Sequence, residues 1–165
     1  MTGTRWLTAD EQTAWRAYLT ANKLLAAALE RELHRSTGVT FAYYDILVRL
    51  SEAPGRRLRM SDLADAADSS RSRLSHAVAR LEDLGWVTRE ACREDRRGAF
   101  AHLTDTGFEA LVAAAPAHVG SVRTHLFDVL DAADVEHLQA ICEKVTDGLR
   151  RHGEREGAGV HGTAA

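Results

Sequence analysis

Arginine, serine and histidine side chains between residues 71 and 84 carry the most distinctive chemistry in this sequence. At helical pitch the segment has one apolar face, formed by Leu74, Ala77, Val78, Leu81 and Leu84. Its opposite face and edges are formed by Arg71, Ser72, Arg73, Ser75, His76 and Arg80. Arginine forks bind guanine edges or phosphates, and small hydroxyl residues let a helix approach base edges closely. The segment therefore predicts a helix that lies in the major groove of DNA.

Serines in front of this helix extend the predicted surface. Ser69 and Ser70 follow Asp68 in a short turn that also caps the helix, where amide groups can face a phosphate. Ser61 begins a shorter helix before that turn. We expect all three serines to contact DNA.

A second basic group follows in the polar segment 92–98, which ends in glycine. It contains Arg93, Arg96 and Arg97 and lies between two segments with the pattern of short strands. Two strands around such a loop predict a β-hairpin with a protruding tip. A thin arginine tip suits the minor groove, where the negative potential of DNA is concentrated.

The remaining elements must hold these two groups in place. Thr8 and Glu11 have the spacing of a capping box at the start of a helix that should stop near Gly38, and Thr40 caps a second helix that Pro54 breaks. Gly85 ends the helix that begins at Arg71. The predicted order is helix 8–37, a helix from 40, a short helix from 61, helix 71–84, strands 86–89 and 99–103, and two helices within 104–150.

This order predicts a mainly α fold with a small β-hairpin wing (α+β). A short helix, a tight turn, a longer helix and a hairpin form a winged helix-turn-helix, which we place at 40–103 within a single domain 1–165. The helices 8–37 and 104–150 carry apolar stripes too wide for a lone small domain to cover, which predicts a homodimer. The tail 151–165 is rich in glycine and alanine and is expected to be disordered.

The charge distribution agrees with nucleic acid as a partner. The 165-residue chain has a formal net charge of −3, yet residues 56–103 contain ten arginines and eight acidic residues, so the middle of the chain is locally basic. No apolar run approaches the ~20 residues of a membrane span, and the N-terminus lacks the pattern of a signal peptide. With two cysteines and no disulfide framework, a cytoplasmic protein is expected.

Four stretches together resemble the MarR family of bacterial transcriptional regulators. They are Met60–Ala64, Ser70–Val87, Asp95–Arg97 and Leu103–Gly107, and the resemblance covers the chain from about Thr8 to Leu149. It implies a homodimer, a recognition helix at 71–84 and a wing at 92–98, which Asp95 braces. It also implies a regulator, most often a repressor, whose affinity for a roughly palindromic operator changes when a small ligand binds near the dimer interface.

Aromatic residues on the predicted dimerisation helices are candidates for lining that ligand pocket. The candidates are Trp15, Tyr18, Tyr43, Tyr44 and His118. Aromatic stripes at helical spacing are more often packing residues, so core or dimer contacts remain the competing interpretation. The effector is a small molecule of unknown identity, and no cofactor is expected.

Catalysis and metal binding find less support in the sequence. Ser72 and His76 share a helix face, but neither an orienting acid nor an oxyanion site accompanies them, so no enzyme is expected. Four histidines fall on the predicted dimerisation helices, although their spacing matches no compact zinc motif and no metal is expected. The competing functions are a metal- or redox-responsive regulator of the same fold and a dimeric protein-interaction module.

The two cysteines receive different interpretations. Cys92 lies beside the wing arginines, so a redox switch is open, but an unreactive exposed thiol is favoured. Cys142 lies on the apolar stripe of the last helix and is expected in the core.

Overall fold

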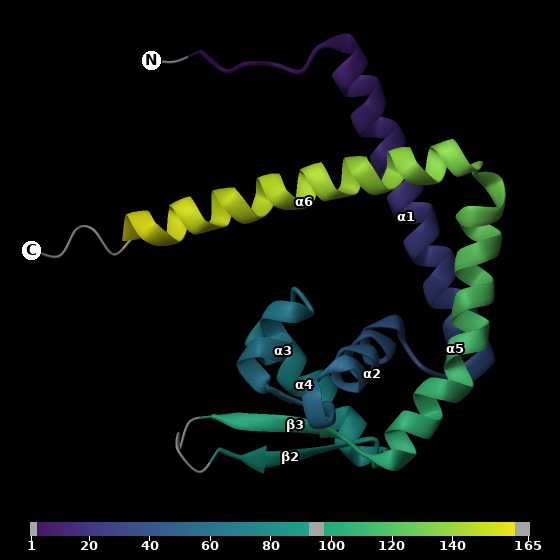
Figure 1. Cartoon of the computed structure of the whole chain (residues 1–165), viewed down its shortest axis with the longest axis vertical. Helices are drawn as coiled ribbons and strands as arrows, with labels where there is room; N and C mark the ends of the chain where they lie inside the picture. The colour runs from purple at the N-terminus through teal and green to yellow at the C-terminus, as the bar shows by residue number, and fades with distance from the viewer. Residues whose placement is uncertain (1–2, 93–97, 161–165) are drawn as a thin grey trace, which may run out of the picture. The chain divides into compact units, whose positions relative to one another are not determined.

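The computed structural model describes residues 3–92 and 98–160, the last of these, from 153, by their backbone alone. The chain divides into two compact units, residues 1–122 and 123–165. The first unit holds α1 (Ala9–Thr37), α2 (Phe41–Glu52), η1 (Pro54–Arg56), β1 (Arg57–Arg59), α3 (Met60–Ala66), α4 (Arg71–Asp83), β2 (Val87–Ala91), β3 (Ala99–Leu103) and most of α5 (Asp105–His125) (Figure 1). The second unit holds η2 (Phe127–Val129) and α6 (Ala132–Val160). The predicted mainly α fold with a β-hairpin is confirmed.

Local capping signals set the limits of the first two helices as predicted. Thr8 and Glu11 form the capping box of α1, with the Thr8 backbone N–H donating to Glu11 Oε2 at 2.7 Å. Gly38 ends α1 in the left-handed region, at a φ of 73°, which a residue with a side chain rarely adopts. Thr40 caps α2, accepting a hydrogen bond from the backbone of Tyr43.

The turn between α3 and α4 has the geometry of a helix-turn-helix. The backbone of Ser69 donates to Ala64 O at 2.9 Å, and Asp68 takes a positive φ of 46° to reverse the chain. Ser70 then caps α4 by accepting from the backbone N–H of Arg73. The predicted turn and cap are thus confirmed.

The sheet has one more strand than the sequence predicts. The strand order is β1-β3-β2, with all neighbours antiparallel, so β3 is central and Ala101 pairs with Leu58 on one side and Arg89 on the other. β1 has only three residues, Arg57, Leu58 and Arg59, which is too short to show strand periodicity. It becomes a strand because β3 offers it a partner.

The core of the first unit gathers apolar residues from α1 to α5. The largest fully buried side chains are Leu33, Leu47, Leu50, Leu63, Leu74, Val78, Leu81, Val87 and Leu103. Leu84 was expected among them but is 50% exposed, because α4 ends at Asp83 and Leu84 is the cap residue that turns toward Gly85. The other apolar residues expected on that helix face are buried or half-buried.

The second unit corrects two predictions. α6 continues to Val160, so residues 151–160 are helical and the tail predicted to be disordered from 151 is wrong over that part. Arginine, glutamate and alanine, which are strong helix formers, outweigh the scattered glycines there. Cys142, expected in the core, is exposed, as are Ile141, Val145 and Leu149 of the same apolar stripe.

Within the described residues, no helix combines the length and apolar character needed to cross a membrane.

Gly107 allows α5 to lie close to the backbone of Trp86. A Cβ at this position would overlap the carbonyl oxygen of Trp86 and lie 2.8 Å from Leu103 Cδ1. We expect Gly107→Ala to lower the free energy of unfolding by about 1–3 kcal/mol or more, because the backbone of Trp86 must move. Urea denaturation of the purified protein measures this change.

Gly120, in the same helix, is the matched control. A Cβ at Gly120 meets nothing within 4 Å, so Gly120→Ala should raise stability by about 0.5–1 kcal/mol. Equal effects of the two substitutions would contradict the proposed close approach.

Candidate nucleic-acid interface

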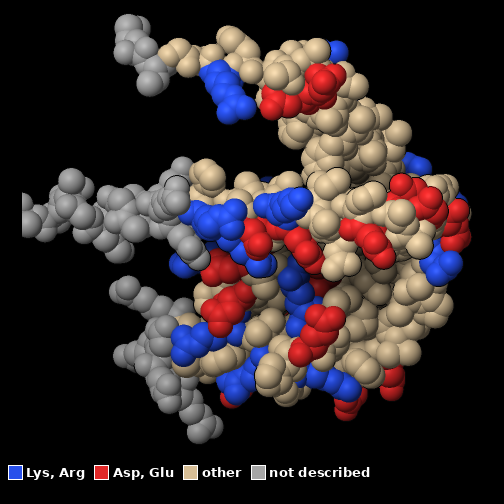
Figure 2. Space-filling model, turned by 45° about the horizontal axis from the view of Figure 1, so that its top comes forward, with Lys and Arg blue, Asp and Glu red and all other residues tan. Residues whose placement is uncertain are grey.

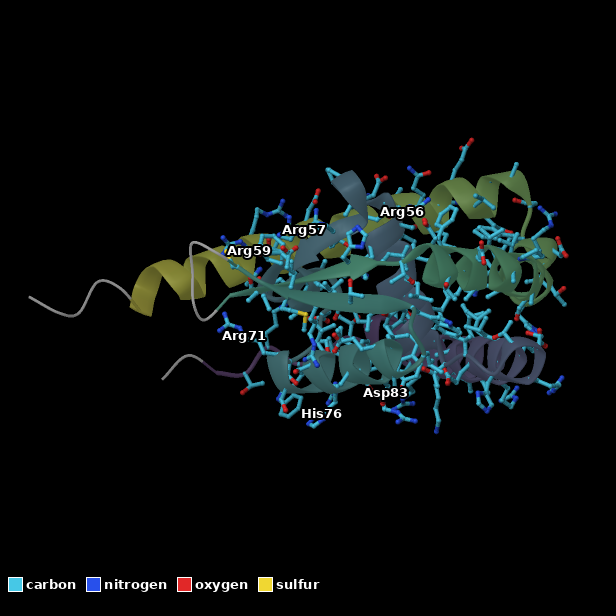
Figure 3. All side chains as sticks on the ribbon, turned by 90° about the horizontal axis from the view of Figure 1, so that it is seen from below. Arg56, Arg57, Arg59, Arg71, His76 and Asp83 are labelled. Carbon is cyan, nitrogen blue, oxygen red and sulfur yellow. The ribbon has the colours of Figure 1, made fainter. Side chains whose placement is uncertain are left out.

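Helix α4 buries one face and exposes the other. Leu74, Val78 and Leu81 are at most 2% exposed, and they anchor the helix in the core. The residues expected on the outer face and its edges, Arg71, Ser72, Arg73, His76 and Arg80, are all exposed, while Ser75 is half-buried. Figure 3 shows His76 and Asp83 along the side of α4 that faces away from the sheet.

A groove of about 490 Å³ lies beside this face, where α3 and α4 begin and the strands β2 and β3 meet. It is lined by Arg59, Met60, Ser61, Arg71, Ser75, Arg89, Gly98 and Ala99. Figure 3 shows Arg59 and Arg71 toward the same end of the sheet. Three arginines therefore line one groove.

Two of these arginines were missed by the sequence analysis. Arg59 ends the unexpected strand β1, and Arg89 lies in β2. Arg59 donates from Nη2 to Cys92 Sγ at 3.6 Å, and its guanidinium lies 5.3 Å from the Phe100 ring centroid. The sequence offers only the three-residue alternation Arg57-Leu58-Arg59, which identifies a strand only once its pairing with β3 is known.

The serines expected at the interface have mixed settings. Ser70 is exposed, but its hydroxyl oxygen already accepts from the α4 backbone. Ser61 donates to Asp62 Oδ1 at 3.0 Å and lines the groove. Ser69 is half-buried in the turn. Ser61 and Ser75 are therefore the two expected interface serines that line the groove with the three arginines.

Acidic residues pair with several arginines of the winged helix-turn-helix, residues 40–103. Arg80 donates to Asp83 at 3.0 Å, and both side chains are mostly exposed. Figure 2 shows acidic and basic side chains interspersed over the visible surface. Attraction of a polyanion must therefore depend on where the arginines cluster, since the net charge of the chain is −3.

The predicted wing residues Arg93, Asp95, Arg96 and Arg97 lie outside the described residues, so their roles stay predictions. The base of the hairpin is described: the backbone of Cys92 donates to Gly98 O at 2.8 Å. Cys92 itself is 8% exposed, so the expectation of an exposed thiol is wrong. The Arg59 side chain packs against its sulfur, a contact that depends on the unpredicted strand β1.

The aromatic ligand candidates separate into two groups. Trp15 and Tyr18 stack at a centroid distance of 5.9 Å on the exposed half of α1. The ring centroids of Tyr44 and His118 lie 4.6 Å apart, and Tyr43, on the same helix as Tyr44, packs against the core. Among the described residues, no ring contact joins the two groups, so the structure does not bring all five candidates together.

The group around His118 has unusual electrostatics. Burial raises the pKa of Tyr44 and lowers the pKa of His118. His118 Nδ1 and Ser121 Oγ are buried without a hydrogen-bond partner in the described structure. Phe41, 5.8 Å from the His118 ring, and Ser121, one helical turn from His118, were both missed by the sequence analysis.

The described residues contain no group of three or more histidine, cysteine, aspartate or glutamate side chains that could hold a metal ion.

Comparison with known proteins identifies relatives of this fold. A sequence model of the MarR family matches residues 37–98. The structure of Sco3205, a MarR family transcriptional regulator from Streptomyces coelicolor in complex with DNA, is 52% identical, with a TM-score of 0.84 over 88% of this chain and 92% of that one. AbsC, a MarR family transcriptional regulator from the same organism, is 48% identical, with a TM-score of 0.82 over 89% and 99% of the two chains.

A more distant relative is the transcriptional repressor MprA of Escherichia coli K12, 26% identical over 115 residues. This match covers 70% of the present chain and 65% of MprA, slightly less than two thirds of its length. The family assignment rests on Sco3205 and AbsC, because their 52% and 48% identity extends over nearly the whole chain. The chain belongs to the MarR family of transcriptional regulators, which confirms the expectation of a regulator rather than an enzyme.

Proposed function

We propose that this protein is a dimeric, sequence-specific DNA-binding regulator, acting as a repressor, whose affinity for DNA changes when a small ligand binds. The observation that carries the proposal is the exposed basic and hydroxyl face of α4 beside the groove of Arg59, Arg71 and Arg89. The DNA complex of Sco3205, a relative with about half of its residues identical, supports it.

The proposed docking places α4 in the major groove. Ser72, Arg73 and His76 on the first turns of the helix face base edges, because contacts concentrate near the start of a recognition helix. The groove arginines then bind backbone phosphates, and Ser69, Ser70 and the α4 amides support them. The wing arginines, which lie outside the described residues, are proposed to enter the adjacent minor groove.

The proposed dimer explains apolar surface that the structure leaves open in each unit. On α1, Trp15, Tyr18, Leu19 and Leu24 are 44–64% exposed. On α6, Ile141, Val145 and Leu149 are 55–69% exposed. An isologous contact covers such stripes in both copies at once, and its two-fold axis implies a roughly palindromic operator.

The proposed ligand site is the group around His118 and Tyr44. Two buried polar atoms without partners, next to aromatic rings, suit a small aromatic molecule with hydrogen-bonding groups. Such a ligand changes DNA affinity only if it binds better to one arrangement of the two recognition helices than to another. The repressor role rests on the name of MprA.

Removing Arg71 should weaken DNA binding. We expect Arg71→Ala to cost about 1–3 kcal/mol of binding free energy, and the wild-type affinity to fall steeply with salt as counterions are released. Fluorescence anisotropy with a duplex that the wild-type protein selects from random-sequence DNA measures both. Arg123→Ala, which removes the same charge from the second unit, is the control. Unchanged affinity of Arg71→Ala would contradict the proposed interface.

A charge on the α6 stripe should break the proposed dimer. We expect Leu149→Asp to sediment as a monomer and to lose tight DNA binding, because a carboxylate buried at an apolar interface is strongly unfavourable. Leu84→Asp, which changes a half-exposed leucine of the DNA-binding lobe, should leave the dimer intact. A wild-type monomer at micromolar concentration in sedimentation would refute this part of the proposal.

The buried His118 should make stability depend on pH. Its pKa is lowered by burial from an ordinary value of 6.5, so the unfolded chain takes up a proton before the folded one does. The free energy of unfolding should therefore fall as pH drops below about 6.5, and His118→Phe should remove this contribution. Urea denaturation between about pH 5 and 8 compares the two proteins. Parallel pH curves would show that the burial of His118 does not matter.

A further inference from the structure

Glu82, in the last turn of α4, holds Arg89 of β2 with both of its carboxylate oxygens. Oε1 accepts from the backbone N–H of Arg89 at 2.9 Å, and Oε2 accepts from the side-chain Nε. The two side chains are 27% and 37% exposed, so the pair is partly shielded from water. This contact ties the end of the recognition helix to the first strand of the hairpin.

The same contact sets the direction of the Arg89 guanidinium. Because Nε is bound to Glu82, the two terminal Nη groups are the donors left for a further partner. Arg89 pairs in the sheet with buried Ala101, and it lines the groove with Arg59 and Arg71. Because the contact with Glu82 already restricts the Arg89 side chain, its Nη groups can bind a partner with little further loss of side-chain entropy.

The neighbouring acidic residues provide a contrast. Asp83, the next residue on α4, pairs with Arg80, but those side chains are 65% and 69% exposed and are open to water. Glu90, the next residue on β2, pairs with Arg57, which stacks on Phe100 on the other face of the strand. The arginines that Asp83 and Glu90 pair with, Arg80 and Arg57, do not line the groove.

We propose that Glu82 is a positioning residue for DNA binding, which holds the Arg89 guanidinium in the groove so that its Nη groups bind a DNA phosphate. This inference rests on the proposed function and goes beyond it, because it assigns a favourable role in DNA affinity to a negatively charged residue. A carboxylate near DNA repels phosphate, so its removal should tighten binding if charge alone mattered. A positioning role has the opposite sign.

The experiment measures the affinity of full-length variants for the selected duplex at several salt concentrations. We expect Glu82→Gln to weaken binding about three- to tenfold, whereas Asp83→Asn binds as tightly as wild type or more tightly. Arg89→Ala should weaken binding at least as much and reduce the slope of log affinity against log salt by about 1. The double variant Glu82→Gln, Arg89→Ala should match Arg89→Ala alone, since Glu82 acts through Arg89.

A reversed pair separates positioning from mere folding. Glu82→Arg with Arg89→Glu restores an ion pair between α4 and β2 but removes the cation from β2 and the acceptor of the residue 89 backbone N–H. It should be more stable in urea denaturation than Glu82→Arg alone and still bind weakly. Wild-type affinity of Glu82→Gln or of the reversed pair would overturn the inference, and so would a further loss on adding Glu82→Gln to Arg89→Ala. A wild-type protein that selects no duplex would overturn the proposed function itself, a result distinct from all of these.

Discussion

The one-sided burial of α4 is the constraint on which the rest of the molecule depends. Leu74, Val78 and Leu81 recur at helical spacing, and all three are almost fully buried. Because a packed interior fixes both the depth and the rotation of a helix, these leucines and valine decide which residues face outward. The chemistry of the outer face is therefore set by residues that never contact a ligand.

The corner after α4 extends this constraint to the hairpin and to α5. Gly85, at a φ of 73°, turns the chain, and the Trp86 carbonyl accepts from the backbone of Thr104 at 3.0 Å. The Thr104 hydroxyl donates to Gly85 O at 2.8 Å and accepts from the backbone of Gly107. Thr104 thus joins the end of α4 to the start of α5, so the hairpin cannot tilt without disturbing both helices.

Features with a local cause could be predicted from the sequence, and features with a tertiary cause could not. Thr8 with Glu11, Gly38 and Ser70 act on the few residues beside them, and their helix ends lie where the sequence predicts. β1 and the burial of Cys92 depend on β3 and Arg59, which are distant in sequence. The groove residues divide in the same way. Arg71 was predicted from the pitch of its own helix. Arg89 is recognisable only from its contact with Glu82 and its pairing with β3, which the sequence does not reveal.

The junction of α1, α2 and α5 connects the proposed ligand site near His118 with α4. Glu30 of α1 accepts from the backbone of Phe41 at 2.9 Å, and Phe41 and Tyr44 both lie against the His118 ring. The first turn of α2 is therefore held from one side by α1 and from another by α5.

Further along α2, Leu47 and Leu50 share the core with Leu74 and Val78 of α4. Because these side chains pack together in one core cluster, a displacement of α2 at this contact would also displace α4. Because α1 also carries the stripe proposed for the dimer interface, a small displacement at this junction would move α4 relative to the proposed two-fold axis. The packing that holds α4 for its proposed contact with bases would thus also make its position sensitive to the proposed ligand.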